Sequence, residues 1–195
     1  MQYFRKTSKI KCKHITACFA AECIPLLIQQ NINGSSFFNR SWAEYKAGFN
    51  DTAGNYWIGN DRLSQLTLSG RYKLRFELQL HNLSWYWPEY STFVVSDESH
   101  NYTLQVSGYS GLSRGDALAY NNGAMFTTYD RDNDPWTGGP AYNNNCAVYN
   151  GGGFWYKGCS LCNVNTVRGC GSDFEWNAGS AGALKLLTSR MWLTC

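Results

Sequence analysis

The sequence lacks any hydrophobic run long enough to cross a membrane. Its longest mostly apolar stretch, residues 15–28, has fourteen residues and is interrupted by Glu22, whereas a membrane-spanning helix needs about 20. Heptads, internal repeats and low-complexity tracts are also missing, which argues against coiled-coil and solenoid proteins. Charged residues make up only 16% of the chain, which is untypical of disordered proteins. We therefore expect one globular domain and no membrane span.

Clustered positive charge is scarce as well. The formal net charge is +3, but five of the basic residues lie within positions 1–13, so the remainder of the chain is slightly acidic. Nucleic-acid-binding domains usually carry a basic patch or stripe, and we expect no nucleic-acid partner. A catalytic constellation is missing too, because His14, His81 and His100 have no nucleophile in a recognisable motif nearby. The sequence predicts a binding protein and not an enzyme.

Cysteine, by contrast, is abundant. The chain has eight cysteines, which are many for a cytosolic protein. The chain also holds five N-x-S/T sequons, all between residues 33 and 103, and the two features together predict a secreted, extracellular glycoprotein. The sequons are at Asn33, Asn39, Asn50, Asn82 and Asn101. Residues 1–14 are basic and residues 15–28 mostly apolar, which is the outline of a signal peptide. Glu22 and the lack of a clean cleavage site favour the alternative, that residues 1–30 are a segment foreign to the domain.

Short elements are expected from residue 31 onward. Trp42 and Tyr45 have helical spacing, with Ser41 as N-cap and Gly48 as stop. Residues 71–80 alternate apolar and polar side chains, which predicts a half-buried strand. A second short helix is expected over 61–68, and further strands over 85–95, 101–106 and 183–193. These patterns predict an α+β fold with an antiparallel sheet, short helices and a long irregular C-terminal region.

A concentrated acidic loop follows Tyr129. Asp130, Asp132 and Asp134 occupy alternate positions, and carboxylates this close together need a compensating charge. Ca²⁺ binds carboxylate and carbonyl oxygens in flexible geometry, and the Pro and Gly residues that follow favour a loop whose carbonyls turn inward. An EF-hand would need Gly and Glu where Pro135 and Ala141 stand. The sequence therefore predicts a calcium loop of another kind, with a solvated acidic loop as the alternative.

Successive motifs resemble those of fibrinogen C-terminal-like domains. They are, in order, NRSWAEYKAGF over residues 39–49, NYWIGN over 55–60, NYTL from 101, GDALAY from 115, YDRDND over 129–134, the Cys146–Cys159 segment and NVN over 163–165. The resemblance covers about residues 31–193, so residues 31–195 are assigned to this domain, which resembles ficolins, tachylectins, angiopoietins and the fibrinogen chains. Residues 1–30 do not contain the family's N-terminal subdomain. We therefore expect a truncated domain with an exposed sheet edge.

The resemblance implies a calcium site and a disulfide. Asp132 and Asp134 would supply carboxylates to Ca²⁺, and Trp136 and Gly138 would supply backbone carbonyls. Asp130 would orient the loop from behind. Cys146 and Cys159 would form the family's C-terminal disulfide, whose loop closure is worth about 3 kcal/mol in the chain-entropy model.

The resemblance also implies a ligand segment, with contacts from Tyr156, Gly158, Cys159, Ser160 and Asn163. The peptide bond between Gly158 and Cys159 would be cis, as in family members with a ligand pocket. Phe154, Trp155 and Tyr156 form an apolar run that would stack on a sugar, although Trp155 fits a core position equally well.

Several positions depart from the family pattern. Ser160 stands where the acetyl-binding lectins usually have His, and Asn150 replaces a pocket tyrosine. Extra residues over 139–145 lengthen the loop beside the calcium site. Cys162 and Cys170 are additional and are expected to form a local disulfide. The remaining cysteines, Cys12, Cys18, Cys23 and Cys195, have no assignable partners.

Three functional hypotheses follow. The first is a secreted, calcium-dependent lectin that recognises acetylated or related glycans in innate defence. The second is a protein-binding adhesion or receptor-ligand module of the angiopoietin type, whose partner is a cell-surface protein. The third is a non-functional fragment. The sequence leaves the oligomer state open, because fibrinogen-related lectins usually gain avidity through oligomerisation segments and none is recognisable here.

Overall fold

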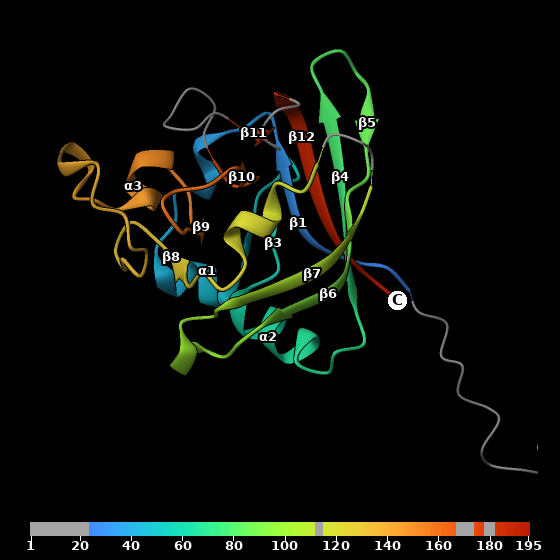
Figure 1. The fold of residues 1–195 in the computed structure, drawn as a ribbon, viewed down its shortest axis with the longest axis horizontal. Coiled ribbons are helices and arrows are strands. Elements are labelled where there is room, and N and C mark those ends of the chain that lie inside the picture. Colours follow the sequence, from blue (N-terminus) through green and yellow to red (C-terminus); the bar gives the residue numbers. More distant parts are fainter. Residues whose placement is uncertain (1–23, 112–114, 167–173, 178–181) are drawn as a thin grey trace, which may run out of the picture.

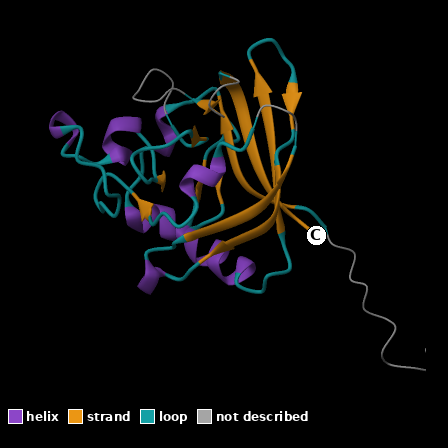
Figure 2. Ribbon diagram, in the orientation of Figure 1, coloured by secondary structure: helices purple, strands orange, loops and turns teal. Residues whose placement is uncertain are grey.

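The computed structural model describes residues 24–111, 115–166, 174–177 and 182–195. Figure 2 shows two parts, an antiparallel sheet on one side and short helices joined by long loops on the other. This arrangement is the α+β fold that the sequence predicts. Within these ranges no helix is both long and apolar enough to cross a membrane.

The main sheet is built around the C-terminal strand. Its order is β2 (Phe49–Asn50), β3 (Tyr56–Trp57), β1 (Leu26–Ile32), β12 (Ala183–Thr194), β4 (Lys73–Leu80), β6 (Glu89–Val95) and β7 (Leu104–Ser110). β5 (Trp85–Tyr86) pairs with β4, and β11 (Glu175–Asn177) lies between β10 (Cys162–Asn163) and β12. All these pairings are antiparallel, and Figure 1 shows β12 between β1 and β4. A separate pair, β8 (Phe126–Thr127) with β9 (Phe154–Trp155), lies among the helices.

Two helices form where the sequence predicts them. α1 (Trp42–Ala47) begins at Ser41 with a complete capping box, because the Ser41 hydroxyl accepts from the Glu44 N–H and the Glu44 carboxylate accepts from the Ser41 N–H. α1 ends at Gly48, whose φ of 90° favours glycine. α2 runs over Asn60–Thr67. The additional helical turns are α3 (Cys146–Asn150), η1 (Ser36–Phe38), η2 (Glu98–His100), η3 (Leu118–Asn121) and η4 (Pro140–Tyr142).

The predicted strands are present with altered ends. β4 confirms the half-buried pattern, with its apolar residues inward. The expected strand over 85–95 is broken at Pro88 into β5 and β6. β7 begins later than predicted and continues through Gly108, whose φ is 70° and whose Cβ would lie 1.9 Å from the Ser91 hydroxyl. Gly108 therefore allows β7 to lie close to Ser91 of the neighbouring strand β6.

The domain boundary expected after residue 30 falls inside a strand. β1 pairs with β12 from Leu26↔Leu193 to Ile32↔Thr188, and with β3 on its other side. Ile28 and Gln29 are fully buried. β1 thus belongs to the domain and occupies the interior of the sheet, where an exposed edge was expected. The sequence analysis did not predict β1, because the apolar residues of this strand were interpreted as the end of a signal-like segment.

An aromatic core joins the helices to the functional loops. The Trp57, Phe126 and Trp155 rings pack with centroid distances of 5.2 to 6.1 Å. Tyr45 of α1 lies 5.0 Å from Phe126. Burying one such ring stabilises a fold by about 1.5–3 kcal/mol. The strands β8 and β9, from which the acidic loop and the predicted ligand segment extend, are therefore firmly anchored.

Candidate functional site

The acidic loop begins on a rigid base beside α1. Asp130 accepts hydrogen bonds from the Trp42 N–H and the Thr128 hydroxyl, each at 2.8 Å. Thr128 and Arg131 exchange backbone hydrogen bonds across a tight turn. The guanidinium of Arg131 lies over the Trp42 ring, 3.9 Å from its centroid. The orienting role expected of Asp130 therefore has a direct geometric basis.

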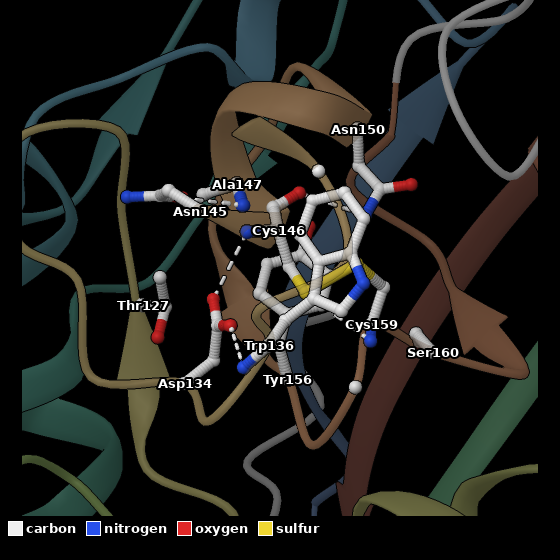
Figure 3. Close-up of a disulfide and its surroundings, with 12 residues drawn as sticks. Thr127, Asp134, Trp136, Asn145, Cys146, Ala147, Asn150, Tyr156, Cys159 and Ser160 are labelled. Atoms are coloured by element: carbon white, nitrogen blue, oxygen red, sulfur yellow. Dashed lines mark hydrogen bonds between the residues drawn. A yellow bond between two sulfur atoms is a disulfide. The ribbon is translucent and has the colours of Figure 1, made fainter. Parts of the chain in front are cut away.

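The second predicted calcium carboxylate, Asp134, points into the molecule. Its oxygens accept from the N–H groups of Trp136 and Cys146, each at 3.0 Å, as Figure 3 shows. The pKa of Asp134 is raised from its ordinary 3.8 to about 6. Burial is the main cause and the neighbouring Asp132 carboxylate adds to it, while the N–H groups of Trp136 and Cys146 oppose the rise. The ionised Asp134 is thus destabilised at its position, a cost that a nearby cation would offset.

The donor set of this loop fits a hard cation. Asp132 is exposed and accepts only from the Asp134 N–H, at 3.2 Å, in the described part of the chain. The carbonyls of Trp136 and Gly138 accept no backbone hydrogen bond from the described residues. Two carboxylates and two peptide carbonyls are oxygen ligands of the kind that Ca²⁺ prefers. The described ranges hold no cluster of three or more His, Cys, Asp or Glu placed for a metal, so the carbonyls are necessary to this set.

The predicted disulfide between Cys146 and Cys159 is present. Figure 3 shows it between α3 and the segment that follows Tyr156. Asn145 caps α3, because its side chain accepts from Ala147 N at 2.7 Å and Val148 N at 3.1 Å. The disulfide and Asp134 therefore fasten the acidic loop, α3 and the predicted ligand segment to one another.

Most of the predicted ligand residues are internal. Phe154, Trp155 and Tyr156 are each fully buried, so the expectation that these rings stack on a sugar is wrong. The Tyr156 hydroxyl donates to the Gly152 carbonyl and accepts from the Asn163 amide at 2.8 Å. Asn163 is also buried. Both side chains shape the segment from inside.

The turn at Cys159 differs from the family expectation. No peptide bond among the described residues is cis, so the expected cis bond between Gly158 and Cys159 is not formed. The turn is made instead by positive φ at Cys159, 26°, and by a Lys157 N–H that donates to the Cys159 carbonyl at 3.0 Å. Gly158 remains exposed.

Ser160 and Asn150 are held by the protein itself. The Ser160 hydroxyl donates to the Cys162 carbonyl and accepts from the Asn121 amide at 2.9 Å. Asn150 is buried and donates to the Cys146 carbonyl at 2.8 Å. Both smaller residues therefore make hydrogen bonds within the protein. The Ser160 hydroxyl is used by these bonds and is not available to a ligand.

The predicted bridge between Cys162 and Cys170 is not formed. Cys162 is a fully buried free thiol on β10, and burial raises the pKa of this thiol well above its ordinary value. Cys170 lies outside the described residues, as do Cys12, Cys18 and Cys23. Cys195, expected to have no assignable partner, is disulfide-bonded.

A pocket of about 380 Å³ opens beside the acidic loop. It is lined by Gly123, Ala124, Met125, Asn133, Asp134, Pro135, Tyr156 and Lys157. Its walls come from three segments, which precede β8, form the acidic loop and follow β9. Met125 and Lys157 were not predicted. The only sequence signal for these two residues is their position, since Met125 directly precedes β8 and Lys157 is separated from β9 by Tyr156 alone.

The extra residues over 139–145 form an ordered turn. Asn143 and Asn144 both adopt positive φ, 54° and 56°, a conformation that asparagine tolerates. Tyr142, at the end of η4, lies 4.9 Å from the Tyr149 ring of α3. The insertion thus packs on α3 and extends the surface next to the acidic loop.

The five sequons differ in their surroundings. Asn33, Asn39, Asn50 and Asn82 are exposed. Asn101 is half-buried, and its side chain accepts from Arg131 at 2.7 Å and donates to the Met125 sulfur at 3.2 Å. A glycan at Asn101 would therefore compete with contacts that hold the acidic loop.

Fold and site together define a disulfide-tied recognition domain with a pocket beside a cation-compatible loop. Residues 21–184 match the family model of the C-terminal globular domain of fibrinogen beta and gamma chains. The chain belongs to this family of binding modules.

Individual relatives agree with this assignment. Ficolin-3 of Homo sapiens is 39% identical over 140 residues, which cover 72% of this chain and 45% of the ficolin. The fibrinogen-like globe domain of human ANGPTL2 superposes with a TM-score of 0.75 at 33% identity, covering 87% of this chain and 79% of that one. A lamprey fibrin D-dimer, complexed with the peptide ligand Gly-His-Arg-Pro-amide, has a TM-score of 0.69 at 26% identity, covering 86% and 60%. The chain spans 6% of the length of tenascin of Mus musculus and 60% of microfibril-associated glycoprotein 4 of Bos taurus, two further curated relatives.

Proposed function

We propose that this domain is secreted and binds acetylated sugars in the pocket beside the acidic loop, with Ca²⁺ holding that loop in place. The observation that carries the proposal is the composition of the pocket. Ala124, Met125 and Pro135 offer apolar walls to an acetyl methyl group, while Asp134 and Lys157 supply polar groups at the same opening. A mostly apolar pocket with a few convergent polar groups is typical of small-ligand sites.

Calcium would act on the shape of the pocket. Asp132, Asp134 and the carbonyls of Trp136 and Gly138 would hold the ion. Because Asp134 both lines the pocket and accepts from the Cys146 N–H, ordering this carboxylate fixes one pocket wall against α3. The role assigned to Ca²⁺ is structural, and the ligand is recognised by the protein walls.

Secretion is supported by the disulfides and the exposed sequons. Disulfides persist in oxidising compartments, and the chain contains the Cys146–Cys159 bridge and a disulfide-bonded Cys195. Four of the five sequon asparagines are exposed on the folded domain.

A second candidate function is recognition of a protein segment at the same place. Tyr120, Met125 and Leu161 are exposed by 39%, 39% and 37%. Tyr120 donates from its hydroxyl to the Gly158 carbonyl at 3.3 Å, which places its ring beside the exposed turn. Exposed aromatic and methionine side chains are enriched at protein interfaces, and the lamprey relative holds a short peptide.

The test measures thermal unfolding and ligand binding on protein from a secretory host. Saturating Ca²⁺ is expected to raise the Tm by about 5–10 °C over the value in chelator, because an ion bound only by the native state stabilises it. D132N should abolish this shift. D97N is the matched control, because Asp97 is an exposed carboxylate at the N-cap of η2, outside the acidic loop, that hydrogen-bonds Ser99 and His100.

Calorimetric titration with N-acetylglucosamine then tests the pocket. Binding is expected in Ca²⁺ and not in chelator, and K157E should abolish it while K73E, a charge reversal at an exposed position of β4, should not. A wild-type domain that shows no calcium shift would overturn the calcium role. Binding of Gly-His-Arg-Pro-amide in place of the sugar would favour the second candidate.

A further inference from the structure

A second pocket, of about 390 Å³, lies where the acidic loop begins. It is lined by Asn39, Tyr129 and Val148. These residues come from three separate segments, namely the end of η1, the start of the acidic loop and α3. None of them lines the pocket assigned above to the ligand.

The three walls are fixed relative to one another. Asn145 ties two of them, because its amide donates to the Thr128 carbonyl at 3.0 Å and its oxygen accepts from the Val148 N–H at 3.1 Å. Asp130 ties the third, because its carboxylate accepts from the Trp42 N–H beside the Asn39 segment. The pocket is therefore preorganised, which lowers the entropy cost of filling it.

The polar wall of this pocket is a glycosylation acceptor. Asn39-Arg-Ser41 is a sequon, and Asn39 is exposed. Within the described part of the chain no group hydrogen-bonds the Asn39 side-chain amide, in contrast to Asn101, whose amide is engaged by Arg131 and Met125. The amide nitrogen that would carry a sugar is thus free at the rim of the pocket.

The other walls suit a sugar. Tyr129 is 47% exposed and offers an aromatic surface, and Val148 adds an aliphatic surface. Sugars present apolar C–H faces and an acetamido methyl group together with hydroxyls, so they match an aromatic side with a polar rim. A sugar attached to Asn39 would have a high effective concentration at these walls.

We propose that the first N-acetylglucosamine of an N-linked glycan on Asn39 occupies this pocket, packs on Tyr129 and Val148, and stabilises the acidic loop. The glycan then acts as a structural part of the domain. This inference rests on the secretion included in the proposed function, and it is independent of calcium and of ligand binding.

The experiment uses the full chain from a secretory host that adds high-mannose glycans. Peptide mapping first establishes occupancy at Asn39. Thermal unfolding is then measured in chelator, so that neither the calcium site nor a ligand contributes. N39Q is expected to lower the Tm by about 2–4 °C relative to the glycosylated wild type. S84A removes the Asn82 sequon on the exposed β4–β5 turn but keeps the Asn82 side chain, which accepts from the Ser84 N–H, so it should leave the Tm unchanged.

Two further comparisons locate the effect in the pocket. Trimming the folded protein with an endoglycosidase that leaves one N-acetylglucosamine should preserve the Tm, whereas complete removal of the glycan should lower it as N39Q does. In a double-mutant cycle, Y129A should remove the difference in Tm between the protein with Asn39 and the N39Q variant. An unoccupied Asn39, equal effects of N39Q and S84A, or an undiminished N39Q effect in Y129A would each overturn the proposal.

Discussion

Single asparagine amides hold the functional loops together. Asn145 caps α3 and donates to the Thr128 carbonyl. Asn133 donates to the Phe126 carbonyl at 2.7 Å, and Asn121 donates to the Trp155 carbonyl at 2.6 Å. Each of these bonds joins a segment outside the main sheet to a residue in β8 or β9 or to the residue that follows β8. The asparagine side chains of this region thus satisfy backbone carbonyls that no regular secondary structure pairs.

A second cluster at the residue scale predicts the pH dependence of stability. Hydrogen bonds from Lys46 and then from the Trp42 indole lower the pKa of Glu98 below its ordinary 4.5. A depressed folded-state pKa means that the stabilisation is complete above the unfolded value and is lost as pH falls through the folded value. We therefore expect wild-type Tm to fall below about pH 4.5 more steeply than the Tm of E98Q.

The size of this effect is limited by solvent. Glu98 is 35% exposed, so screening leaves a modest contribution. Unfolding curves between pH 7 and pH 2.5 measure it, with E89Q as control because Glu89 makes only a 3.8 Å contact with Arg75. Parallel pH profiles for wild type and E98Q would show that the Lys46–Glu98 pair has no role in acid stability.

At the scale of elements, the paired strands β6 and β7 approach each other closely at Gly108. A Cβ at Gly108 would meet the Ser91 hydroxyl at 1.9 Å, and the φ of 70° is unfavourable for other residues. Gly70 has a similar φ of 67° with no atom within 4 Å of its Cβ position. G70A therefore measures the cost of the backbone conformation alone, about 1–2 kcal/mol.

G108A should destabilise the domain by about 1–3 kcal/mol more than G70A does, because the strand pair must also move apart. Urea unfolding of the two variants measures the difference. Equal losses would mean that Ser91 rotates away without cost and that the close crossing has no energetic consequence.

Local elements were predictable from sequence, and elements that depend on distant partners were not. α1 carries its own capping box from Ser41 to Glu44, and β4 carries its own alternation, so both follow from nearby residues. β1 becomes a strand because it pairs with β3 on one side and, on the other, with β12, about 160 residues later. Its sequence alone resembles a signal-like apolar run.

The same distinction applies to the site. The acidic loop and the Cys146–Cys159 bridge could be inferred from spacing and family resemblance. The burial of Tyr156 could not, because it depends on Asn163 and the Gly152 carbonyl closing around its hydroxyl. The Met125 and Lys157 walls were missed because they lie side by side only after β8 and β9 pair.

At the scale of the whole molecule, a buried polar network joins the sheet to the predicted ligand segment. Gln29 of β1 donates to the Val164 carbonyl at 2.9 Å and to the Asn165 oxygen at 3.1 Å. Asn165 in turn donates to the Gly153 carbonyl, and the Gly153 N–H donates to the Tyr45 hydroxyl, each at 3.0 Å. One continuous path of hydrogen bonds thus runs from the central sheet to α1.

Q29M keeps the length of the side chain and removes its amide. We expect a loss of about 2–3 kcal/mol, because the buried Asn165 oxygen is left without this donor. Hydrogen exchange at the amides of residues 163–165 should accelerate, which a general loss of packing elsewhere would not produce selectively. Q105M on the exposed side of β7 is the control and should change stability by less than about 0.5 kcal/mol. An unchanged exchange pattern in Q29M would refute the link.

Because the ends of β1 and β12 are neighbours, the domain should resist a force that pulls these two ends apart only weakly. Leu26 and Leu193 are register partners, and Figure 1 shows the C-terminus next to the start of β1. A pulling force applied through both ends would load the first pair of this antiparallel ladder, whose hydrogen bonds run perpendicular to the strands. The hydrogen-bonded pairs of β1 and β12 would then break one after another, at a lower force than is needed to shear all of them at once. The disulfide-bonded Cys195 lies where such a tear would start.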